Sequence, residues 1–329
     1  MKKQDKPLVT VVIPCYNRVI WLEDEINSLK NQTYPNIEIL LVDGGSTDGS
    51  VELAKKLGAR VIRVNINGFD EARLRYEGAI KAKGSIIIQA DSDVHFPKNY
   101  VEEMVKPIIK GEADATAISL IKVHKKRKGL LADFWRIKRL ASHEAKKRGL
   151  HEVKGALAMK KEVIEKVGPY DDSLIVGTDV DYSYRIRKAG FKVKPVFTTW
   201  FHHADPDKLI PFIRRVYWGS YYGHEFMKKW KKGYVKRCVL SVFLNSLFFV
   251  GLILLPLFPL IGFYSLVPIV LSFLIEGVFP LLFYKHYRLM PKLALKEKKV
   301  KLFLLLPFLM YLYMRFDILG WGLGLFRQS

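Results

Sequence analysis

The sequence predicts an α/β domain, a mostly parallel sheet with helices on both faces, followed by C-terminal transmembrane helices. In the first two hundred residues, β-branched runs alternate with segments of helical spacing, which is typical of a covered parallel sheet. Residues 239–284 then carry a single charge, on Glu276, and basic stretches flank this apolar run on both sides. We therefore predict two regions, a domain over residues 1–225 and a membrane region over residues 226–329.

The strand predictions rest on apolar runs that end at polar or turn-forming residues. Val9–Ile13 is a continuous β-branched run that Pro14 ends, as expected for a strand buried on both faces. A helix begins near Ser46 or Asp48, which can cap its first turn, and ends at Gly58, since glycine readily closes helices. The other predicted strands are Ile37–Val42, Arg60–Val64 and Ser85–Gln89, and the other predicted helices are Trp21–Asn31 and Glu71–Lys83.

Polar residues follow three of these strands. Pro14–Asn17 follows the first strand, Asp43 the second and Asp91–Asp93 the fourth. The carboxyl ends of parallel strands meet at one edge of a sheet, and ligands of such sheets bind there. The sequence therefore predicts a binding site built from these three loops.

Two carboxylates in the third loop suit a hard cation. Asp91 and Asp93 can offer oxygen atoms to Mg²⁺ or Mn²⁺, which keep coordination positions open for the oxygens of a diphosphate. Neither G-x-x-x-x-G-K-[ST] nor G-x-G-x-x-G, the two common glycine-rich phosphate loops, occurs in the sequence. A metal ion and side chains are therefore expected to neutralise the phosphate charge.

Four motifs carry a resemblance to a known family. In order, they are VVIPCYN, LLVDGGSTDGS, RYEGAIKAKGSIIIQADSD and VGTDVDYSYRIRKAG. Over roughly residues 7–220 the chain resembles the family-2 glycosyltransferases of the GT-A fold. This resemblance implies a metal-dependent enzyme whose donor is a nucleotide-diphosphate sugar, most often UDP-linked.

The resemblance also implies a role for individual residues. Pro14 and Tyr16 would flank the base and Asp43 would hydrogen-bond it. The alternatives are that Tyr16 caps the strand end and that Asp43 forms a turn. A basic residue before Gly78 would approach the base or diphosphate, and Arg75 fits this position better than Arg73. The full predicted nucleotide-sugar set is Pro14, Tyr16, Asp43, Arg75, Asp91 and Ser92.

The metal ligands implied by the resemblance come from two places. Asp93 would ligate the ion, with help from Asp91. A histidine after the strand KVKPVFTTW would complete the coordination, and either His203 or His202 can serve, because imidazole suits Mn²⁺. The expected cofactor is a divalent metal, Mn²⁺ or Mg²⁺.

Asp179 is the predicted catalytic base. In the family an Asp at this place removes a proton from the acceptor hydroxyl during inverting transfer, which a positioned carboxylate can do. Thr178 stands where relatives commonly carry Glu, and Asp179 can alternatively cap the helix that follows. Asp181 is expected to be structural and to pair with Arg185 four residues on.

A processive synthase would carry a Gln-x-x-Arg-Trp box soon after the base. The corresponding stretch, Phe212–Trp218, contains arginine and tryptophan but no glutamine, and the two are not adjacent. We therefore expect a non-processive hexosyltransferase that adds one sugar.

The net charge of the chain limits the classes of partner that it is expected to bind. The sequence has 54 basic and 32 acidic residues, a net charge of +22, which excludes an acidic or disordered chain. Basic surfaces also bind nucleic acid. Here the cations adjoin apolar segments, so membrane lipids explain them more directly, and no nucleic-acid partner is expected.

The membrane prediction rests on length and flanking charge. Two apolar segments, about 239–260 and 263–284, each match the length of a bilayer-spanning helix, and a third, about 302–326, is either a span or an interfacial helix. Lys228–Arg237 carries six basic residues and no acid, and Lys285–Lys301 carries seven against one Glu. The positive-inside rule then predicts a multi-pass protein of the cell membrane with a cytoplasmic catalytic domain.

A third basic stretch bears on the acceptor. Lys122–Lys154 interleaves cations with aromatic residues and is either a solvated helix or an amphipathic helix on the membrane. Three basic segments favour a lipid-linked acceptor, of polyprenyl-phosphate type or a glycolipid. The alternatives are a nucleotidyltransferase that forms an activated sugar or alcohol and, within the family, transfer to a non-lipid acceptor. The sequence indicates no particular oligomeric state.

Overall fold

The computed structural model describes residues 6–66, 70–148, 156–230, 234–257, 260, 266–284 and 287–324. The chain divides into two compact units. A sheet unit contains residues 1–126, 152–173 and 178–204, and a helical unit contains residues 127–151, 174–177 and 205–329. The boundary predicted near residue 225 separates a domain outside the membrane from a membrane region, and it stays a prediction.

The sheet unit is built on one eight-stranded sheet. Its strands are β1 (Val9–Cys15), β2 (Ile37–Asp43), β3 (Arg60–Arg63), β4 (Ile86–Gln89), β5 (Val94–His95), β6 (Ala115–Val123), β7 (Ala156–Lys160) and β8 (Val193–His203). They lie in the order β3-β2-β1-β4-β7-β6-β8-β5. The strands β3, β2, β1 and β4 are parallel, as are β6 and β8. In contrast, β7 runs antiparallel to β4 and β6, and β5 runs antiparallel to β8, so the sheet is mixed.

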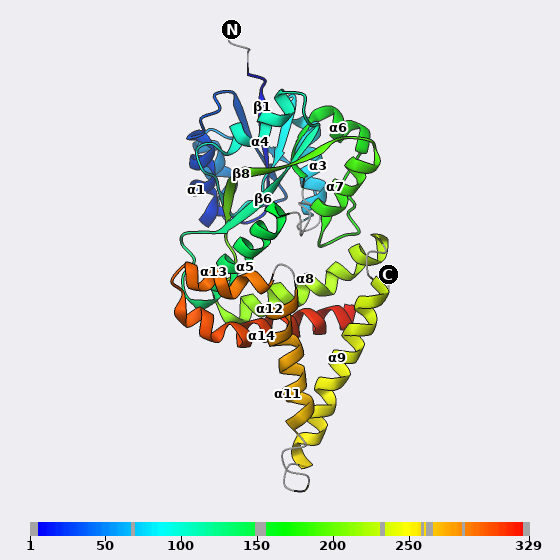
Figure 1. Ribbon diagram of the computed structural model, residues 1–329. Coiled ribbons are helices and arrows are strands. Elements are labelled where there is room, and N and C mark those ends of the chain that lie inside the picture. The colour runs from blue at the N-terminus through cyan, green and yellow to red at the C-terminus, as the bar shows by residue number, and fades with distance from the viewer. Residues whose placement is uncertain are drawn as a thin grey trace. The chain divides into compact units, whose positions relative to one another are not determined.

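Helices cover both faces of this sheet, as the sequence predicts. One apolar cluster packs α1 (Val19–Lys30), α2 (Ser50–Lys56) and α4 (Tyr100–Ile109) on one face. A second cluster packs α3 (Glu71–Lys81), α6 (Lys161–Val167) and α7 (Thr178–Lys188) on the other. Figure 1 shows α1 on the opposite side of the sheet from α3 and α7. Successive residues of β1 alternate between the two clusters, because side chains of a strand point to opposite faces.

Close packing places α3 on the sheet. A Cβ atom on Gly78 would lie 2.4 Å from Val12 Cγ1 and 2.6 Å from Val42 Cγ2. Only glycine therefore allows α3 to approach β1 and β2 this closely. The approach brings Arg75, one turn earlier on the same helix, to the sheet, where it is 5% exposed.

The helix after β2 begins later than predicted. Its first residue is Ser50 and its N-cap is Gly49, so neither Ser46 nor Asp48 occupies the cap position. Asp48 still contacts the helix start, because its Oδ1 accepts a hydrogen bond from the N–H of Ser50 at 3.0 Å, while its Oδ2 accepts one from the N–H of Val19. Ser46 Oγ accepts a hydrogen bond from the N–H of Asn17, so both side chains also join this loop to residues that follow β1.

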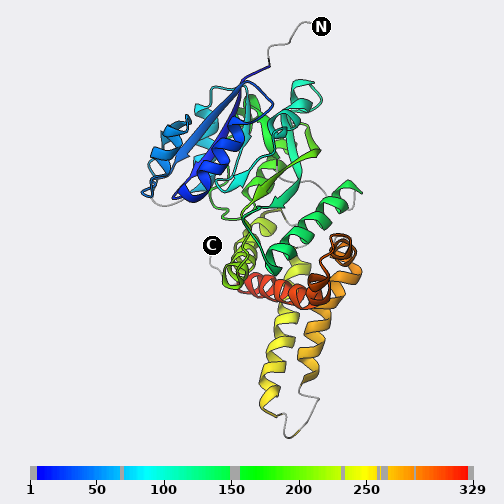
Figure 2. The same ribbon diagram turned by 90° about the vertical axis from the view of Figure 1, so that its left-hand side faces the viewer.

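The helical unit consists of apolar and amphipathic helices. They are α5 (Leu130–Lys147), α8 (Leu209–Trp230), α9 (Tyr234–Leu254), α11 (Val267–Phe273), α12 (Phe279–Phe283), α13 (Met290–Lys296) and α14 (Val300–Gly324). A π-helical turn, Leu274–Val278, joins α11 to α12. Figures 1 and 2 show α9 and α11 side by side within this unit.

These helices correct the predicted pair of membrane spans. In the first predicted span, the apolar helix runs from Val242 to Leu254 only, and the second is interrupted and bends by 75° before residues Tyr287–Lys296. Within the described residues, Val300–Gly320 is the helix long and apolar enough to cross a bilayer, and the bent pair is a second candidate if it counts as one span. The expectation of several passes is therefore not supported. The predicted turn residues Pro259 and Gly262 lie outside the described residues.

The structure does not support the interpretation of the basic stretch around α5 as an amphipathic helix on the membrane. Phe134 and Trp135 are 0% and 8% exposed, and their rings pack against Phe212 of α8 and Tyr313 of α14 at centroid distances of 5.6–6.0 Å. The aromatic face of α5 is thus covered by protein within the helical unit. It is not available to lie in a lipid interface.

Candidate active site

The predicted loops meet because the first strands are parallel. In the register of β1 and β2, Cys15 lies opposite Asp43, and β4 pairs with β1 up to Val12 and Gln89. The chain segments that follow these three strands therefore leave the sheet at the same edge. Pro14 sits within β1 beyond its last pairing with β4, where a missing backbone N–H breaks no bond to that strand.

The loop after β1 is held by the loop after β2. Ser46 Oγ accepts a hydrogen bond from the backbone N–H of Asn17 at 3.0 Å, and Asn17 Oδ1 accepts one from the N–H of Thr47 at 2.9 Å. Tyr16 lies between these contacts and β1 with 36% of its surface exposed. Its ring is therefore accessible to a ligand at this edge.

Asp43 is already engaged in a turn. The residue is 0% exposed, and its carboxylate accepts hydrogen bonds from the backbone N–H groups of Gly45 and Ser46 at 3.2 and 2.9 Å. It also accepts one from Arg63 Nε at 3.0 Å. The turn-forming role is thus present, and a bond from Asp43 to a base stays a prediction.

Arg75, rather than Arg73, reaches the predicted acidic loop. Its guanidinium is hydrogen-bonded to Glu71, at 2.6 and 2.9 Å, and to Asp91. Burial lowers the pKa of Arg75, but Glu71 and Asp91 more than offset this and raise it above its usual range. The side chain is therefore a permanently charged group beside Asp91, whereas Arg73 is exposed.

The strands β5 and β8 bring one histidine to the two aspartates. His203 Nε2 lies 3.6 Å from Asp93 Oδ1 and 3.9 Å from Asp91 Oδ2. Ser92, between the aspartates, is buried, and its Oγ accepts a hydrogen bond from Arg18 Nε at 3.3 Å. The acidic loop is thus fixed on both sides.

His202 belongs to a different cluster. Its ring lies 5.9 Å from that of His95 and 6.3 Å from that of His124. Both of these rings contact Asp24 of α1, through His95 Nδ1 at 3.2 Å and His124 Nε2 at 3.1 Å. Adjacent residues of a strand point to opposite faces, which is why only His203 approaches Asp91 and Asp93.

The predicted base lies in the first turn of α7. Asp179 is exposed to solvent and is the second residue of the helix. The protein around its carboxyl raises the pKa of Asp179, the negative charge of Asp91 adds to this, and Arg75 opposes it. Asp179 thus lies within electrostatic reach of the acidic loop.

Contacts with the segment before it hold α7 in place. Arg185 donates hydrogen bonds to the carbonyl oxygens of Pro169 and Val167 at 2.6 and 2.8 Å, and Tyr182 donates one to Gly168 at 3.0 Å. The expected pairing of Asp181 with Arg185 is present at 3.9 Å. These contacts fix the helix that presents Asp179.

One acidic residue near this site escaped the sequence analysis. Glu25, on α1, is 0% exposed, and neither of its carboxylate oxygens has a hydrogen-bond partner among the described residues. It lies three residues after Leu22 and four before Leu29, both buried on the same helix face. An acidic residue on the apolar face of a predicted helix is the signal that could have identified it.

The site fits a cation only together with a ligand. Within the described ranges, no group of three or more His, Cys, Asp or Glu side chains forms a ready metal cage. Asp91 and Asp93 nevertheless each place a carboxylate oxygen within 4 Å of His203 Nε2. Mg²⁺-type ions are commonly held by one or two carboxylates plus substrate phosphates, so this donor set fits such an ion.

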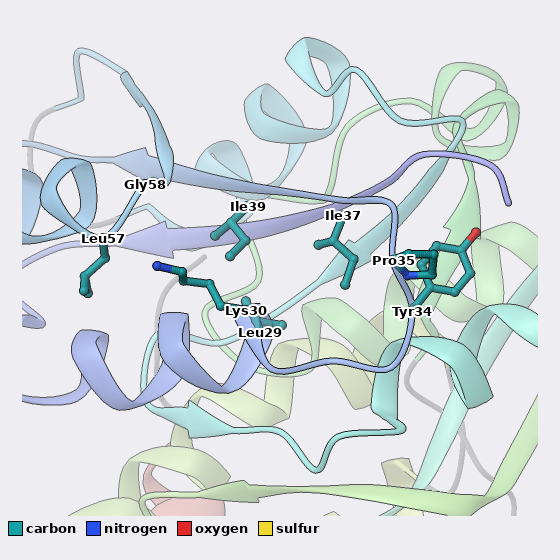
Figure 3. A pocket seen from close by; sticks show the side chains of 8 residues that line it. All are labelled: Leu29, Lys30, Tyr34, Pro35, Ile37, Ile39, Leu57 and Gly58. Atoms are coloured by element: carbon teal, nitrogen blue, oxygen red, sulfur yellow. The ribbon is translucent and has the colours of Figure 1, made fainter.

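A separate cavity of about 270 Å³ lies at the other end of β2. Figure 3 shows its lining, which includes Ile37 and Ile39 of β2, Leu29 and Lys30 of α1 and Leu57. Ile37 begins β2, whereas Asp43 ends it. Among the residues that the structure describes, no acidic side chain lines this cavity, so it offers no carboxylate ligand for the predicted cation.

Comparisons with known proteins point to a glycosyltransferase family. Residues 10–168 match the model of Glycosyl transferase family 2. The chain is 28% identical over 230 residues to succinoglycan biosynthesis protein ExoA of Rhizobium meliloti (strain 1021), covering 65% of this chain and 67% of the relative. It is 27% identical over 194 residues to glycosyltransferase AglE of Haloferax volcanii, covering 57% of this chain and 64% of the relative. The matches thus span about two thirds of these relatives.

A solved structure shares the fold. The chain aligns with mannosyltransferase PcManGT from Pyrobaculum calidifontis, in complex with GDP-Man and Mn²⁺, at a TM-score of 0.58 and 17% identity. The alignment covers 99% of this chain and 89% of that one. The sheet unit therefore has the predicted GT-A fold.

Proposed function

Because residues 10–168 belong to glycosyl transferase family 2, we propose that this glycosyltransferase moves one sugar from a nucleotide-diphosphate sugar to a lipid-linked acceptor at a membrane. The proposed transfer depends on a divalent cation and inverts the anomeric centre. UDP is the expected nucleotide. The relatives ExoA and AglE carry names that refer to succinoglycan biosynthesis and to glycosyl transfer, which supports a role in building a glycan.

One observation carries the proposal. Arg75, Asp91, Asp93 and His203, which come from three separate segments, meet beside the strand edge where Asp179 lies within electrostatic reach. Inverting transfer needs a group that holds the departing diphosphate and a base that faces the acceptor. The gathered residues supply one of each.

The donor end of this site combines acidic metal ligands with one fixed positive charge. Asp93 and Asp91, with His203, would hold a divalent cation, which when bound offsets the charge that grows on the departing diphosphate. Arg75 adds a fixed positive charge beside Asp91, and charge-assisted hydrogen bonds from a guanidinium suit phosphate oxygens. Tyr16 and Pro14 offer an exposed ring and a rigid backbone for the base.

The acceptor end depends on Asp179. A carboxylate that is exposed and ionised can take the proton of an acceptor hydroxyl as its oxygen attacks the anomeric carbon. The attack comes from the side opposite the departing diphosphate, and this geometry inverts the centre. Phe212–Trp218 lacks the glutamine of a processive box, which supports addition of a single sugar.

The surface of the helical unit supports a membrane location. Apolar side chains stand exposed on three of its helices, among them Phe243 and Ile253 on α9, Val270 on α11 and Leu304 and Phe308 on α14. Exposed apolar surface of this extent indicates contact with lipid or protein. Lysines of α13 and the following turn are exposed as well, and each cation near an anionic bilayer gains about 1 kcal/mol. We propose that the catalytic unit acts on the cytoplasmic face of the cell membrane.

The proposal is tested by product analysis. The full chain, purified in detergent, is incubated with a native lipid extract, Mn²⁺ and separate nucleotide sugars that include UDP-linked sugars and GDP-mannose. We expect mass spectrometry to find a lipid whose mass has increased by one sugar, with an equal amount of nucleoside diphosphate released. GDP-mannose is included because PcManGT is solved with GDP-Man.

Other outcomes would overturn parts of the proposal. Full-rate transfer to a soluble acceptor without lipid would contradict the lipid-linked acceptor. Release of pyrophosphate from a nucleoside triphosphate and a sugar phosphate would instead support a nucleotidyltransferase. Products that carry several added sugars would contradict single addition.

A further inference from the structure

Glu25 is a buried acidic residue on α1. It is 0% exposed, and both of its carboxylate oxygens are buried without a hydrogen bond among the described residues. An unpaired polar group in a protein interior destabilises the folded state, and more so if it is charged. A buried carboxyl that destabilises the folded protein in this way is explained if a ligand, once bound, interacts with it.

The segment that carries Asp93 runs along α1 at the position of Glu25. Three hydrogen-bonded pairs join α1 and the residue before it to residues 92–96, at 3.3, 3.2 and 3.1 Å: Arg18–Ser92, Asp24–His95 and Ser28–Phe96. Glu25 lies between the second and third of these contacts in the sequence of α1, on its buried face. It therefore lies against the same stretch of chain as Asp93.

Electrostatics connects Glu25 with the acidic loop. Burial raises the pKa of Glu25 well above its usual range, and the negative charges of Asp93 and Asp91 raise it further, while Arg75 opposes them. The three carboxyl groups therefore share one local field. A cation at Asp91 and Asp93 would act on Glu25 with the opposite sign.

We propose that Glu25 is a further carboxylate of the cation site, a positioning residue that strengthens divalent-cation binding at Asp91 and Asp93. The proposal rests on the metal dependence given above as part of the proposed function. With a cation bound, Glu25 would add a further negative charge near the two aspartates without contact with solvent. The bound cation would in turn offset the cost of burying this charge.

The test compares two acids of the same helix. The full chain in detergent is titrated with Mn²⁺ in the presence of UDP, and free Mn²⁺ is followed by electron paramagnetic resonance against a blank of UDP without protein, for the wild type, Glu25→Gln and Glu23→Gln. Glu23 is exposed, so its variant loses the same charge at a site outside the interior. We expect Glu25→Gln to weaken Mn²⁺ binding about tenfold or more, the usual effect of removing a group that supports metal ligands, and Glu23→Gln to leave it unchanged.

Thermal unfolding in the presence of a chelator gives a second readout. Glu25→Gln is expected to be at least as stable as the wild type without metal, because a neutral amide avoids repulsion from Asp91 and Asp93. It is expected to gain less stability than the wild type when Mn²⁺ is added. A purely structural role for Glu25 would lower stability in both conditions equally.

The outcomes separate this inference from the proposed function. A wild type that binds no Mn²⁺ contradicts the metal dependence itself. A wild type and a Glu25→Gln variant that bind Mn²⁺ equally contradict only the role of Glu25. If Glu25→Gln fails to fold, Glu25→Met, which fills the same apolar surroundings without charge, is titrated in its place and must show the same loss.

Discussion

Arg75 joins Glu71 of its own helix to Asp91 at the end of the neighbouring strand. This buried guanidinium fixes the direction of the Asp91 carboxylate, because each hydrogen bond between charged groups restricts both partners. The arrangement depends on Gly78, which lets α3 pack closely against β1 and β2. Arg75, which is predicted to contact the donor, thus also orients Asp91.

Replacing Arg75 is expected to impair donor binding. Arg75→Lys keeps the charge but loses the guanidinium geometry that reaches two carboxylates, so the KM for the nucleotide sugar should rise about tenfold or more. Arg73→Lys is the control, because Arg73 is exposed two residues away on the same helix. Steady-state kinetics on both variants checks this, and equal effects would contradict the choice of Arg75.

Asp179→Asn distinguishes a hydroxyl acceptor from a phosphate acceptor. Loss of a general base costs about 100-fold or more in kcat, so that loss is expected if the acceptor is a hydroxyl. A lipid phosphate is already ionised and needs no base, and the variant would then be nearly as active as the wild type. Asp181→Asn is the control: Asp181 is buried and paired with Arg185, so it should lower thermal stability more than kcat.

The pKa of Asp179 predicts how activity varies with pH. Only the ionised carboxylate can act as a base, and its pKa is raised in the folded protein. Activity should therefore rise with pH through a limb that lies above the pKa of an ordinary aspartate. Because the folded state holds this proton more tightly than the unfolded state, stability falls as pH rises across the interval between the two pKa values. Asp179→Asn should remove the acidic limb and unfold at an equal or higher temperature near neutral pH.

Binding of the divalent cation should depend on Asp93 and on one of the two histidines. Asp93→Ala is expected to abolish both turnover and metal-dependent nucleotide binding, and excess chelator should do the same to the wild type. His203→Ala should weaken Mn²⁺ binding, whereas His202→Ala should not, since His202 faces the cluster around Asp24. Mn²⁺ titration of both histidine variants checks this. The reverse order of effects would assign the ligand role to His202.

Arg315 and Glu276 form a buried ion pair that should stabilise the helical unit. Arg315 Nη1 lies 2.9 Å from Glu276 Oε1, and Ser272 donates a hydrogen bond to the same oxygen at 2.9 Å. Removing one partner of a buried pair costs about 3–5 kcal/mol, so Arg315→Met should lower the free energy of unfolding in detergent by that order. Lys301→Met, an exposed position on the same helix, should have little effect.

A double variant checks that the two residues act together. Residues in direct contact show non-additive effects, so Arg315→Met combined with Glu276→Gln should lose less stability than the sum of the two single changes. Additive losses would mean that the pair does not stabilise the unit as a pair.

Much of the sheet unit follows from local patterns. β-branched runs and the polar residues that end them predict β1 to β4 within one or two residues, because such runs suit a buried strand and little else. The metal-ligand prediction follows from the residue type and its position in the chain. Two aspartates directly after a strand lie at the edge of the sheet where ligands bind. The helical unit is less predictable, because an apolar run has the same composition whether protein or lipid covers it.

The sequence by itself therefore determined the fold class and the loops that leave the sheet at one edge, and it led to the predictions for Asp91, Asp93 and Asp179. The tertiary structure alone decided that His203 approaches Asp91 and Asp93, that Arg75 reaches Asp91, and that Glu25 lies buried along the same loop. The physical reason is that each of these relations joins segments far apart in the chain. Strand register and helix packing set such distances, and neither is written in the local order of residues.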